Sequence, residues 1–276
     1  MRKKLCLIAV TTIAVFFALN LTDSNAEYIC GDANDDGSLN VSDAIYIANY
    51  VFVGGPVPDP NCCESDCPPT VTDIDGNTYF TVEVGDQCWM AQNLKVTHYS
   101  NGDPIPNVTD GGVWGGLTTG AYCDYNNEAG NAAIYGRLYN WYAVIDIRDI
   151  APEGWHVPTD AEWKQLEIFL GLSLAEADAE GWRGTDEGGK LKEIGIMHWG
   201  SPNTGATNES GFTVLPAGTR SVSGNFSNLG ADARLWSSTE ASSTGGGYRW
   251  LEYSHSDIYR FRYVKGGGLS VRCVKD

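Results

Sequence analysis

Residues 152–163 read Pro152-Glu-Gly-Trp-His-Val-Pro-Thr-Asp-Ala-Glu-Trp163, and this stretch carries the clearest helix signal of the chain. Thr159 stands before the expected helix and Glu162 follows three residues later, which is the spacing of a capping box. Gly171 marks the end of the helix. The apolar residues at helical spacing between these two signals are Trp163, Leu166 and Leu170. The stretch therefore predicts an amphipathic helix that begins after Thr159.

Short strands are predicted around this helix. In residues 258–264 the aromatic residues Tyr259, Phe261 and Tyr263 alternate with arginines, which is typical of a half-buried strand. The other strand-like segments are 70–74, 78–84, 88–90, 212–215, 235–238, 247–253 and 269–274. Periodicity predicts a second helix over 137–145, and the residues 101–131, rich in Gly, Asn and Asp, are expected to form long surface loops. Two helices among short strands indicate an α+β domain.

Length and composition bound the possible functions. The chain has 276 residues, which corresponds to one large domain or two modest ones. With 42% apolar and 19% charged residues, it can bury a hydrophobic core. The formal net charge is −17, so the surface would repel a phosphate backbone and nucleic-acid binding is disfavoured.

The N-terminus has the pattern of a secretory signal peptide. Arg2, Lys3 and Lys4 precede an apolar stretch at 5–21, and Ser24-Asn25-Ala26 resembles a signal peptidase site. We expect residues 1–26 to be removed and the protein to be secreted. The alternative is a membrane anchor, because a predominantly apolar stretch of 17 residues is just long enough to span a bilayer. No later stretch is apolar enough to span a membrane.

A calcium-binding loop is predicted directly after the signal peptide, at Asp32-Ala-Asn34-Asp-Asp36-Gly37-Ser38-Leu-Asn40-Val-Ser-Asp43. Oxygen side chains fall at loop positions 1, 3, 5, 9 and 12, and a glycine stands at position 6, as in an EF-hand. The predicted ligands are Asp32, Asn34, Asp36, Ser38 through its carbonyl, Asn40 and Asp43. A helix is expected to follow from residue 44. The alternative is a turn rich in Asp and Asn that binds no metal.

Residues 31–55 resemble a dockerin type I repeat, a loop-helix calcium unit that attaches secreted proteins to cohesin domains. A dockerin has two such repeats, and this chain has one within the expected unit of residues 27–55. The resemblance implies that this unit binds calcium. It also implies that the partner is a cohesin or another surface protein. Residues 56–70, rich in Pro and Cys, are predicted to be a linker before a large domain at 71–276.

Seven cysteines remain after removal of the signal peptide. They are Cys30, Cys62, Cys63, Cys67, Cys88, Cys123 and Cys273. Outside the cell most of them should pair, and an odd number leaves at least one thiol free or in an intermolecular bridge. One hypothesis joins Cys30 to Cys62, Cys63 or Cys67. Zinc binding is disfavoured, because the cysteine cluster lacks ligand spacing and a nearby His.

The large domain resembles the Fibrobacter succinogenes major paralogous domain. The motifs that carry the resemblance are Asp75-Gly-Asn77, Cys88-Trp-Met-Ala-Gln-Asn-Leu94, Tyr135-Gly-Arg-Leu-Tyr-Asn-Trp141, Pro152-Glu-Gly-Trp-His-Val-Pro-Thr159, Asn208-Glu-Ser-Gly-Phe212, Trp236-Ser-Ser238 and Ser270-Val-Arg-Cys273. This resemblance implies a fold like C-type lectins and formylglycine-generating enzymes. Many members carry a cysteine where this chain has Ala151, so Cys88 or Cys123 becomes the candidate partner of Cys273.

The sequence favours a protein without catalytic activity. It has no His-Glu-x-x-His, no Gly-x-Ser-x-Gly and no dinucleotide fingerprint. Formylglycine generation relies on a pair of reactive cysteines, which Cys273 alone does not supply. The four histidines are scattered, and His156 is expected to be a packed hydrogen-bonding residue. Chemistry by a pair of carboxylates stays open, because the sequence does not give their separation.

Aromatic residues suggest a binding function instead. Trp114, between glycines, is the tryptophan expected to be most exposed, and Tyr122 and Tyr125 lie in the same loop region. Tyr248 and Trp250 form a second candidate group. Flat rings beside amides and carboxylates suit sugar recognition, so glycan or another surface polymer is the predicted ligand. The alternatives are an adhesion module that binds proteins and a former formylglycine-generating enzyme without its cysteine pair.

Overall fold

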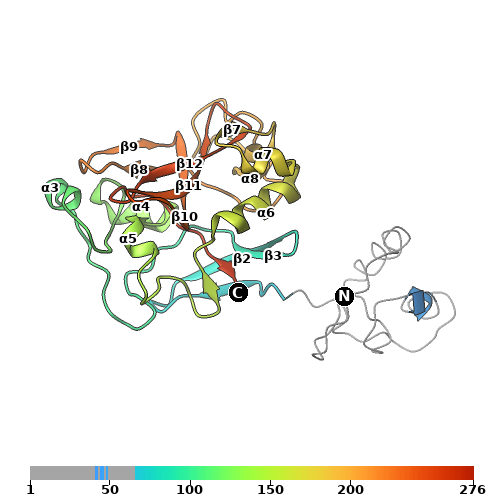
Figure 1. Cartoon of the computed structure of the whole chain (residues 1–276), viewed down its shortest axis with the longest axis horizontal. Helices are drawn as coiled ribbons and strands as arrows, with labels where there is room; N and C mark the ends of the chain where they lie inside the picture. Colours follow the sequence, from blue (N-terminus) through green and yellow to red (C-terminus); the bar gives the residue numbers. More distant parts are fainter. Residues whose placement is uncertain (1–40, 43, 47, 49–65) are drawn as a thin grey trace. The chain divides into compact units, whose positions relative to one another are not determined.

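The computed structural model describes residues 41–42, 44–46, 48 and 66–276. The chain divides into two compact units, residues 1–66 and 67–276. In the first unit the described residues between 41 and 48 are helical. The predicted signal peptide and the six predicted calcium ligands lie outside the described residues. The second unit mixes helices and strands, with the strands predominating, as the predicted α+β class requires (Figure 1).

Two larger sheets and one small sheet form the second unit. An antiparallel five-stranded sheet has the order β1(Thr70–Thr72), β2(Thr78–Val84), β3(Gln87–Met90), β13(Val274–Lys275) and β6(Trp155–His156). The six-stranded sheet has the order β7(Gly181–Arg183), β12(Ile258–Val264), β11(Gly245–Glu252), β10(Asp232–Ser242), β8(Ala217–Arg220) and β9(Phe226–Leu229). Its strands are antiparallel except for the pair β10 and β8. The small sheet pairs β4(Tyr122–Cys123) with β5(Leu138–Tyr139).

The helices are short, apart from one. Helix α6 spans Asp160–Leu170, and its capping box between Thr159 and Glu162 is present as predicted. The other helical segments are α3(Gly111–Gly115), η1(Tyr125–Asn127), α4(Ala129–Tyr135), α5(Trp141–Val144), α7(Leu174–Asp178) and α8(Glu187–Leu191). The helix predicted over 137–145 is thus wrong in extent, because strand β5 occupies its first part and only α5 is helical.

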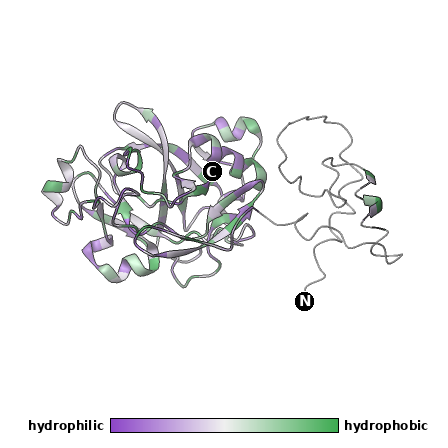
Figure 2. Ribbon diagram, turned by 90° about the horizontal axis from the view of Figure 1, so that it is seen from below, coloured by the Kyte–Doolittle hydropathy of each residue, from purple (hydrophilic) through white to green (hydrophobic). Residues whose placement is uncertain are grey.

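Helix α6 lies between the β2–β3 hairpin and the six-stranded sheet (Figure 1). Its Trp163 packs against Trp89 of β3 at a centroid distance of 4.9 Å and against Phe212 at 6.0 Å. All three rings are fully buried, and Leu235 of β10 and Leu251 of β11 belong to the same core cluster. Hydrophobic and hydrophilic residues are interspersed along the ribbon (Figure 2). Such a mixture is expected where successive residues of a strand point to opposite faces of a sheet.

Three predictions of local structure need correction. Residues 212–215 form no strand, and Val214 makes only an isolated bridge with Lys192. Of the segment 269–274, only the last residue belongs to a strand, β13, because Leu269 and Ser270 make single bridges to two different neighbours. Residues 101–131 hold α3, β4, η1 and the start of α4 instead of loops alone.

The disulfide pattern also differs from the expectation. Cys67 is bonded to Cys88, which ties the start of the second unit to strand β3. Cys123 and Cys273 are buried free thiols, so the pairing of Cys273 with Cys88 or Cys123 is wrong. The hypothesis for Cys30 loses Cys67 as a partner, and Cys30, Cys62 and Cys63 lie outside the described residues. Among the described residues, no helix has the length and apolar character needed to cross a membrane.

Candidate binding face

The six-stranded sheet carries a row of aromatic side chains on one of its two faces. Trp182 on β7 lies opposite Tyr259 on β12, and Tyr259 in turn lies opposite Trp250 on β11. Two residues further along the strands, Tyr248 pairs with Phe261. Because alternate residues of a strand point to the same side, these five rings share one face of the sheet. We call these five residues the aromatic face.

Three rings at the β7 edge form a close triangle. The ring centroids of Trp182 and Trp250 lie 5.0 Å apart, and the centroid of Tyr259 lies 5.2 Å from each of them. All three residues are partly exposed, whereas Tyr248 is buried. The imidazole of His255 stacks on Trp182 at 3.9 Å with an interplanar angle of 7°. The triangle therefore offers solvent a partly exposed aromatic surface whose rings support one another.

Carboxylates border the triangle where the chain turns from β11 to β12. The Nδ1 atom of His255 lies 2.9 Å from the carboxylate of Asp257, and its Nε2 atom lies 3.5 Å from that of Glu252. Both acids are partly exposed. The stacked imidazole is thus flanked by hydrogen-bond acceptors that a ligand hydroxyl can also reach.

A guanidinium group borders the triangle on the β10 side. The Arg234 guanidinium lies 4.4 Å from the centroid of the Trp250 ring, and it donates a hydrogen bond of 2.9 Å to the buried carboxylate of Asp232. Since this pairing largely neutralises the charge of Arg234, the arginine acts mainly as a flat packing partner for the tryptophan. Burial raises the pKa of the neighbouring Tyr248 phenol to about 12, so it stays protonated at neutral pH.

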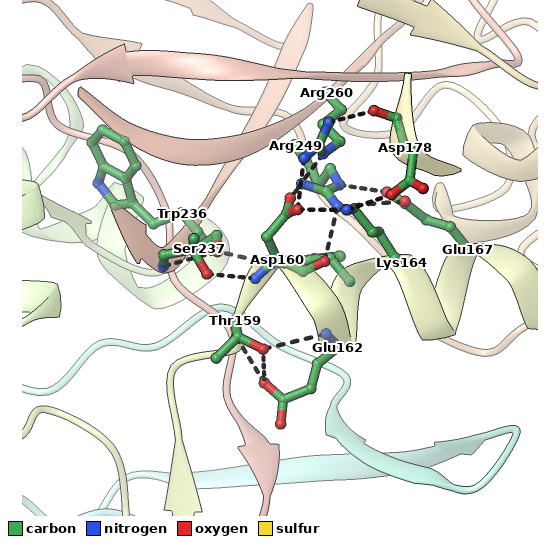
Figure 3. Close-up of polar contacts among 12 residues, drawn as sticks. Thr159, Asp160, Glu162, Lys164, Glu167, Asp178, Trp236, Ser237, Arg249 and Arg260 are labelled. Atoms are coloured by element: carbon green, nitrogen blue, oxygen red, sulfur yellow. Dashed lines mark hydrogen bonds and ion pairs between the residues drawn. The ribbon is translucent and has the colours of Figure 1, made fainter. Parts of the chain in front are cut away.

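The opposite face of the same sheet carries buried charges that bind it to helix α6 (Figure 3). Glu167 on α6 accepts two hydrogen bonds of 2.9 Å from Arg183 and one of 2.5 Å from Arg249. Asp160 accepts a hydrogen bond of 2.8 Å from Arg249 and bonds of 2.9 and 2.7 Å from Arg260. We call these five residues the buried ion cluster.

The charges of the buried ion cluster are mutually stabilised. Burial alone would raise the pKa of Asp160, but hydrogen bonds and charges from Arg260 and Arg249 outweigh it and hold this pKa well below its usual value. Burial lowers the pKa of Arg183, and the hydrogen bonds and charge of Glu167 oppose that shift. Each carboxylate is held by two guanidinium groups. The cluster therefore joins α6 to β7, β11 and β12, and it supports the aromatic face from behind.

The sequence pattern of the Fibrobacter succinogenes major domain matches residues 82–275, which include the aromatic face and the buried ion cluster. The chain belongs to this family. The predicted family is thereby confirmed. No curated protein and no solved structure matches the chain.

The major domain buries the tryptophan that the sequence analysis expected to be most exposed. Trp114 is 0% exposed, and the Arg220 guanidinium lies 4.5 Å from its ring. A side chain on Gly268 would come within 3.0 Å of the same ring. The side chain of Asp110 caps α3 by accepting a 2.8 Å hydrogen bond from the Val113 amide, which fixes the helix. The glycines here permit close packing instead of mobility, so the prediction for Trp114 is wrong.

The two tyrosines predicted beside Trp114 are also buried in the major domain. Tyr122 lies under the Arg137 guanidinium at 4.7 Å, and Tyr125 packs on Phe226 with ring centroids 5.3 Å apart. Neither presents a flat face to solvent, because each ring is covered by a neighbour. Of the five aromatic residues predicted to bind a ligand, only Trp250 is partly exposed.

Sequence reasoning missed most of the aromatic triangle. The alternation of Tyr259 and Phe261 with arginines predicts a strand but does not by itself indicate ligand binding. Nothing near Trp182 in the sequence indicates that it pairs with Tyr259. Its short strand, β7, has only three residues. A usable signal is that aromatic residues alternate with other residues in both β11 and β12. If the two strands are neighbours in one sheet, these aromatic residues lie on the same side of it.

A cleft of about 340 Å³ in the major domain is lined by Val144, Ile145, Asp146, Ile147, Asp149, His156, Val157 and Ser238. Its histidine is already paired on both sides, with Nδ1 2.6 Å from Asp276 and Nε2 2.7 Å from Glu162. Burial lowers the pKa of His156, but the hydrogen bonds to these two carboxylates outweigh it and raise the pKa above its usual value. The expectation that His156 forms hydrogen bonds is confirmed, but its side chain is 33% exposed and is not fully packed.

The predicted calcium site remains a prediction. Its ligands, at residues 32, 34, 36, 38, 40 and 43, lie outside the described residues. Within the part of the chain that the structure describes, no group of three His, Cys, Asp or Glu side chains is placed to hold a metal ion.

Proposed function

We propose that this chain is a secreted, non-catalytic binding module whose aromatic face binds a neutral polysaccharide. The observation that carries the proposal is the triangle of Trp182, Trp250 and Tyr259, which is partly exposed on one side of a braced sheet. Aromatic rings stack on the apolar CH faces of pyranose sugars, and adjacent polar groups bind the hydroxyls.

The charges around the triangle favour a neutral ligand over an acidic one. Glu252 and Asp257 flank the stacked His255, and Arg234 is occupied by Asp232. The chain as a whole carries a formal charge of −17. A uronate-rich or sulfated polymer would therefore meet repulsion at the rim and over long range.

The state of the buried carboxylates supports binding without catalysis. Asp160 and Glu167 are saturated by guanidinium groups, and Glu162 is engaged by the capping box and His156. A general acid or base needs a carboxyl group that can exchange a proton with a substrate. None of these three carboxylates is free for that role.

Retention on insoluble polysaccharides tests the proposal. Purified protein is mixed with cellulose, xylan or polygalacturonate, and the unbound fraction is measured after sedimentation. We expect retention on one or both neutral polymers and none on polygalacturonate. Trp182→Ala and Trp250→Ala should each weaken binding by about 1–3 kcal/mol, which is the stacking energy of a nucleic-acid base on an aromatic side chain and serves here as the estimate for a sugar ring.

Phe80→Ala is the matched control, because Phe80 is also an aromatic residue on a strand, is 66% exposed and lies outside the six-stranded sheet. It should bind as the wild type does. Retention that is unaffected by both tryptophan variants, or absent on every neutral polymer, would contradict the proposal.

A second candidate function is protein binding through an exposed apolar loop. Ile194, Ile196 and Met197 are 64%, 63% and 83% exposed. The base of their loop is fixed, because the Asn203 side chain donates hydrogen bonds of 2.8 and 2.7 Å to the carbonyls of Glu193 and Gly195. A rigid loop with projecting apolar side chains is typical of protein interfaces. Loss of partner binding in Met197→Ser, with polysaccharide retention unchanged, would favour this function.

We also propose that the N-terminal loop binds calcium and that the major domain has a fold like C-type lectins. The oxygen spacing of residues 32–43 supports the first proposal, and the family motifs support the second. Calorimetric titration of the mature protein with calcium should show one site, and Asp36→Ala should abolish it. Heat release that is equal in both proteins would contradict the calcium proposal. A cohesin or another surface protein is the partner that a dockerin-like unit would bind.

A further inference from the structure

Lys192, the residue after helix α8, is fully buried and surrounded by backbone carbonyls. Its ammonium group donates hydrogen bonds of 2.9 Å to Thr204, 3.0 Å to Glu252 and 2.7 Å to His255. An ammonium group has three N–H donors, so each donor has one acceptor. The arrangement resembles the way backbone oxygens surround a bound cation, with the lysine supplying the charge.

Two of these three carbonyls belong to the turn that forms the edge of the aromatic face. The carbonyl of Glu252 also accepts a hydrogen bond of 3.3 Å from the His255 amide. Lys192 therefore binds the backbone at both ends of the segment 252–255. The ring of His255 at the end of this segment is the one that stacks on Trp182.

Close packing against α8 holds the next part of the same turn. The Gly189 amide donates a 2.8 Å hydrogen bond to the Ser256 carbonyl. A Cβ on Gly188 would lie only 2.2 Å from the Asp257 carbonyl oxygen. Helix α8 thus leaves no space for a side chain between itself and residues 256–257. This contact does not reach the segment 252–255, whose carbonyls face the Lys192 ammonium.

We propose that Lys192 is a positioning residue for the aromatic face. Its ammonium group binds the backbone of the segment 252–255 as a bound cation would, and it thereby keeps His255 stacked on Trp182. The stacked imidazole widens the surface that is available to a sugar ring. The effect on ligand binding rests on the proposed function. The stacking itself can be measured without any ligand.

Proton NMR of the His255 imidazole gives that measurement. A ring stacked on Trp182 experiences the ring current of the indole, so its protons resonate upfield. We expect Lys192→Met to lose this upfield shift and to bind the neutral polysaccharide more weakly. Lys190→Met is the matched control, because Lys190 is two residues away and pairs with Asp186 at 2.9 Å. It should keep both properties.

Rescue by a small cation separates positioning from simple loss of packing. Lys192→Ala leaves the three carbonyls without their cation, and an ammonium ion can occupy that place. Ammonium chloride should restore the upfield shift of His255, whereas sodium chloride at the same ionic strength should not. An unchanged shift in Lys192→Met, or equal behaviour of the two salts, overturns the proposal.

An alkaline titration of the wild-type chain tests the proposal if neither variant folds. Burial lowers the pKa of Lys192 to about 8, and the negative charges of Asp257 and Glu252 oppose this shift. The Trp199 ring, 5.4 Å from the ammonium nitrogen, is neutral. The upfield shift of His255 should disappear with the midpoint at which the Lys192 Nζ resonance titrates. A shift that persists after this titration overturns the proposal. Normal stacking behaviour without polysaccharide retention would refute only the proposed function.

Discussion

The two faces of the sheet formed by β7, β12, β11 and β10 have opposite chemistry although they share every strand. Tyr259 and Arg260 are neighbours in sequence, yet Tyr259 joins the aromatic triangle and Arg260 binds Asp160 on α6. On β11, Trp250 and Arg249 divide in the same way. The buried face is covered by helix α6, and each carboxylate of the buried ion cluster is paired with two guanidinium groups. On the aromatic face, the three rings of the triangle are partly exposed.

This difference shows how a loop-rich fold can fix the position of a candidate binding surface. Arg183, Arg249 and Arg260 come from three adjacent strands and meet the carboxylates of a single helix. The strands that carry the triangle are therefore fixed relative to one another from behind. A preorganised surface loses little conformational entropy when it binds, which favours affinity. Changes on the buried face should consequently affect stability most, and changes on the aromatic face should affect binding most.

The largest expected effect is that of Glu167→Gln. The substitution leaves the buried guanidinium groups of Arg183 and Arg249 without their common counter-charge. Removal of one partner from a buried ion pair costs about 3–5 kcal/mol. Guanidinium-induced unfolding, followed by tryptophan fluorescence, should show a loss of this size in the free energy of unfolding.

Glu240→Gln is the control for this prediction. Glu240 pairs with Lys265 at 2.7 Å, but its side chain is 55% exposed. Ion pairs of this kind contribute about 0–1 kcal/mol. If Glu240→Gln and Glu167→Gln destabilise the protein equally, the buried ion cluster is not the brace that we describe.

A smaller contrast is expected between tryptophans of the two faces. Trp163→Ala removes a fully buried ring that packs between Trp89 and Phe212, and such truncations cost about 3–5 kcal/mol. Trp182→Ala removes a partly exposed ring, whose aromatic contacts are worth about 0.5–1.5 kcal/mol each. Thermal unfolding followed by circular dichroism should therefore show the larger decrease in Tm for Trp163→Ala. The reverse order would mean that the triangle belongs to the core.

Local signals in the sequence were sufficient to predict several elements of the major domain. The capping box placed α6 correctly, because Thr159 and Glu162 satisfy each other's backbone amides whatever surrounds them. Strands β2 and β12 have the predicted bounds, 78–84 and 258–264. In β12 the aromatic residues alternate with arginines, and this pattern is a property of neighbouring residues.

The aromatic face and the core around Trp114 could not be predicted in the same way. Pairing of Trp182 with Tyr259 depends on contact between strands far apart in sequence, and no local pattern specifies that register. Trp114 looked exposed because glycines surround it, but its environment is set by Arg220 from β8. The disulfide between Cys67 and Cys88 is likewise a long-range choice among several possible partners.

The smallest expected effect concerns the pH dependence at the start of α6, at the edge of the buried face. His156 bridges Glu162 and Asp276, and its pKa is raised in the folded state. Its stabilisation should therefore be fully present below the unfolded pKa, about 6.5, and should be lost as the pH rises through the higher folded pKa. Solvent screening limits the contribution to less than about 1 kcal/mol, since both partners of this histidine reach the surface.

Urea titration gives the free energy of unfolding of the wild type and of His156→Asn. The difference between the two values, measured below about pH 6.5 and above the folded pKa of His156, isolates this contribution. The difference should shrink with increasing pH, because the protonated imidazole is the form that pairs with Glu162 and Asp276. A difference that grows with pH would mean that the neutral imidazole is the stabilising form. In that case the charged form of His156 would not stabilise the start of α6, and the capping box between Thr159 and Glu162 would fix it alone.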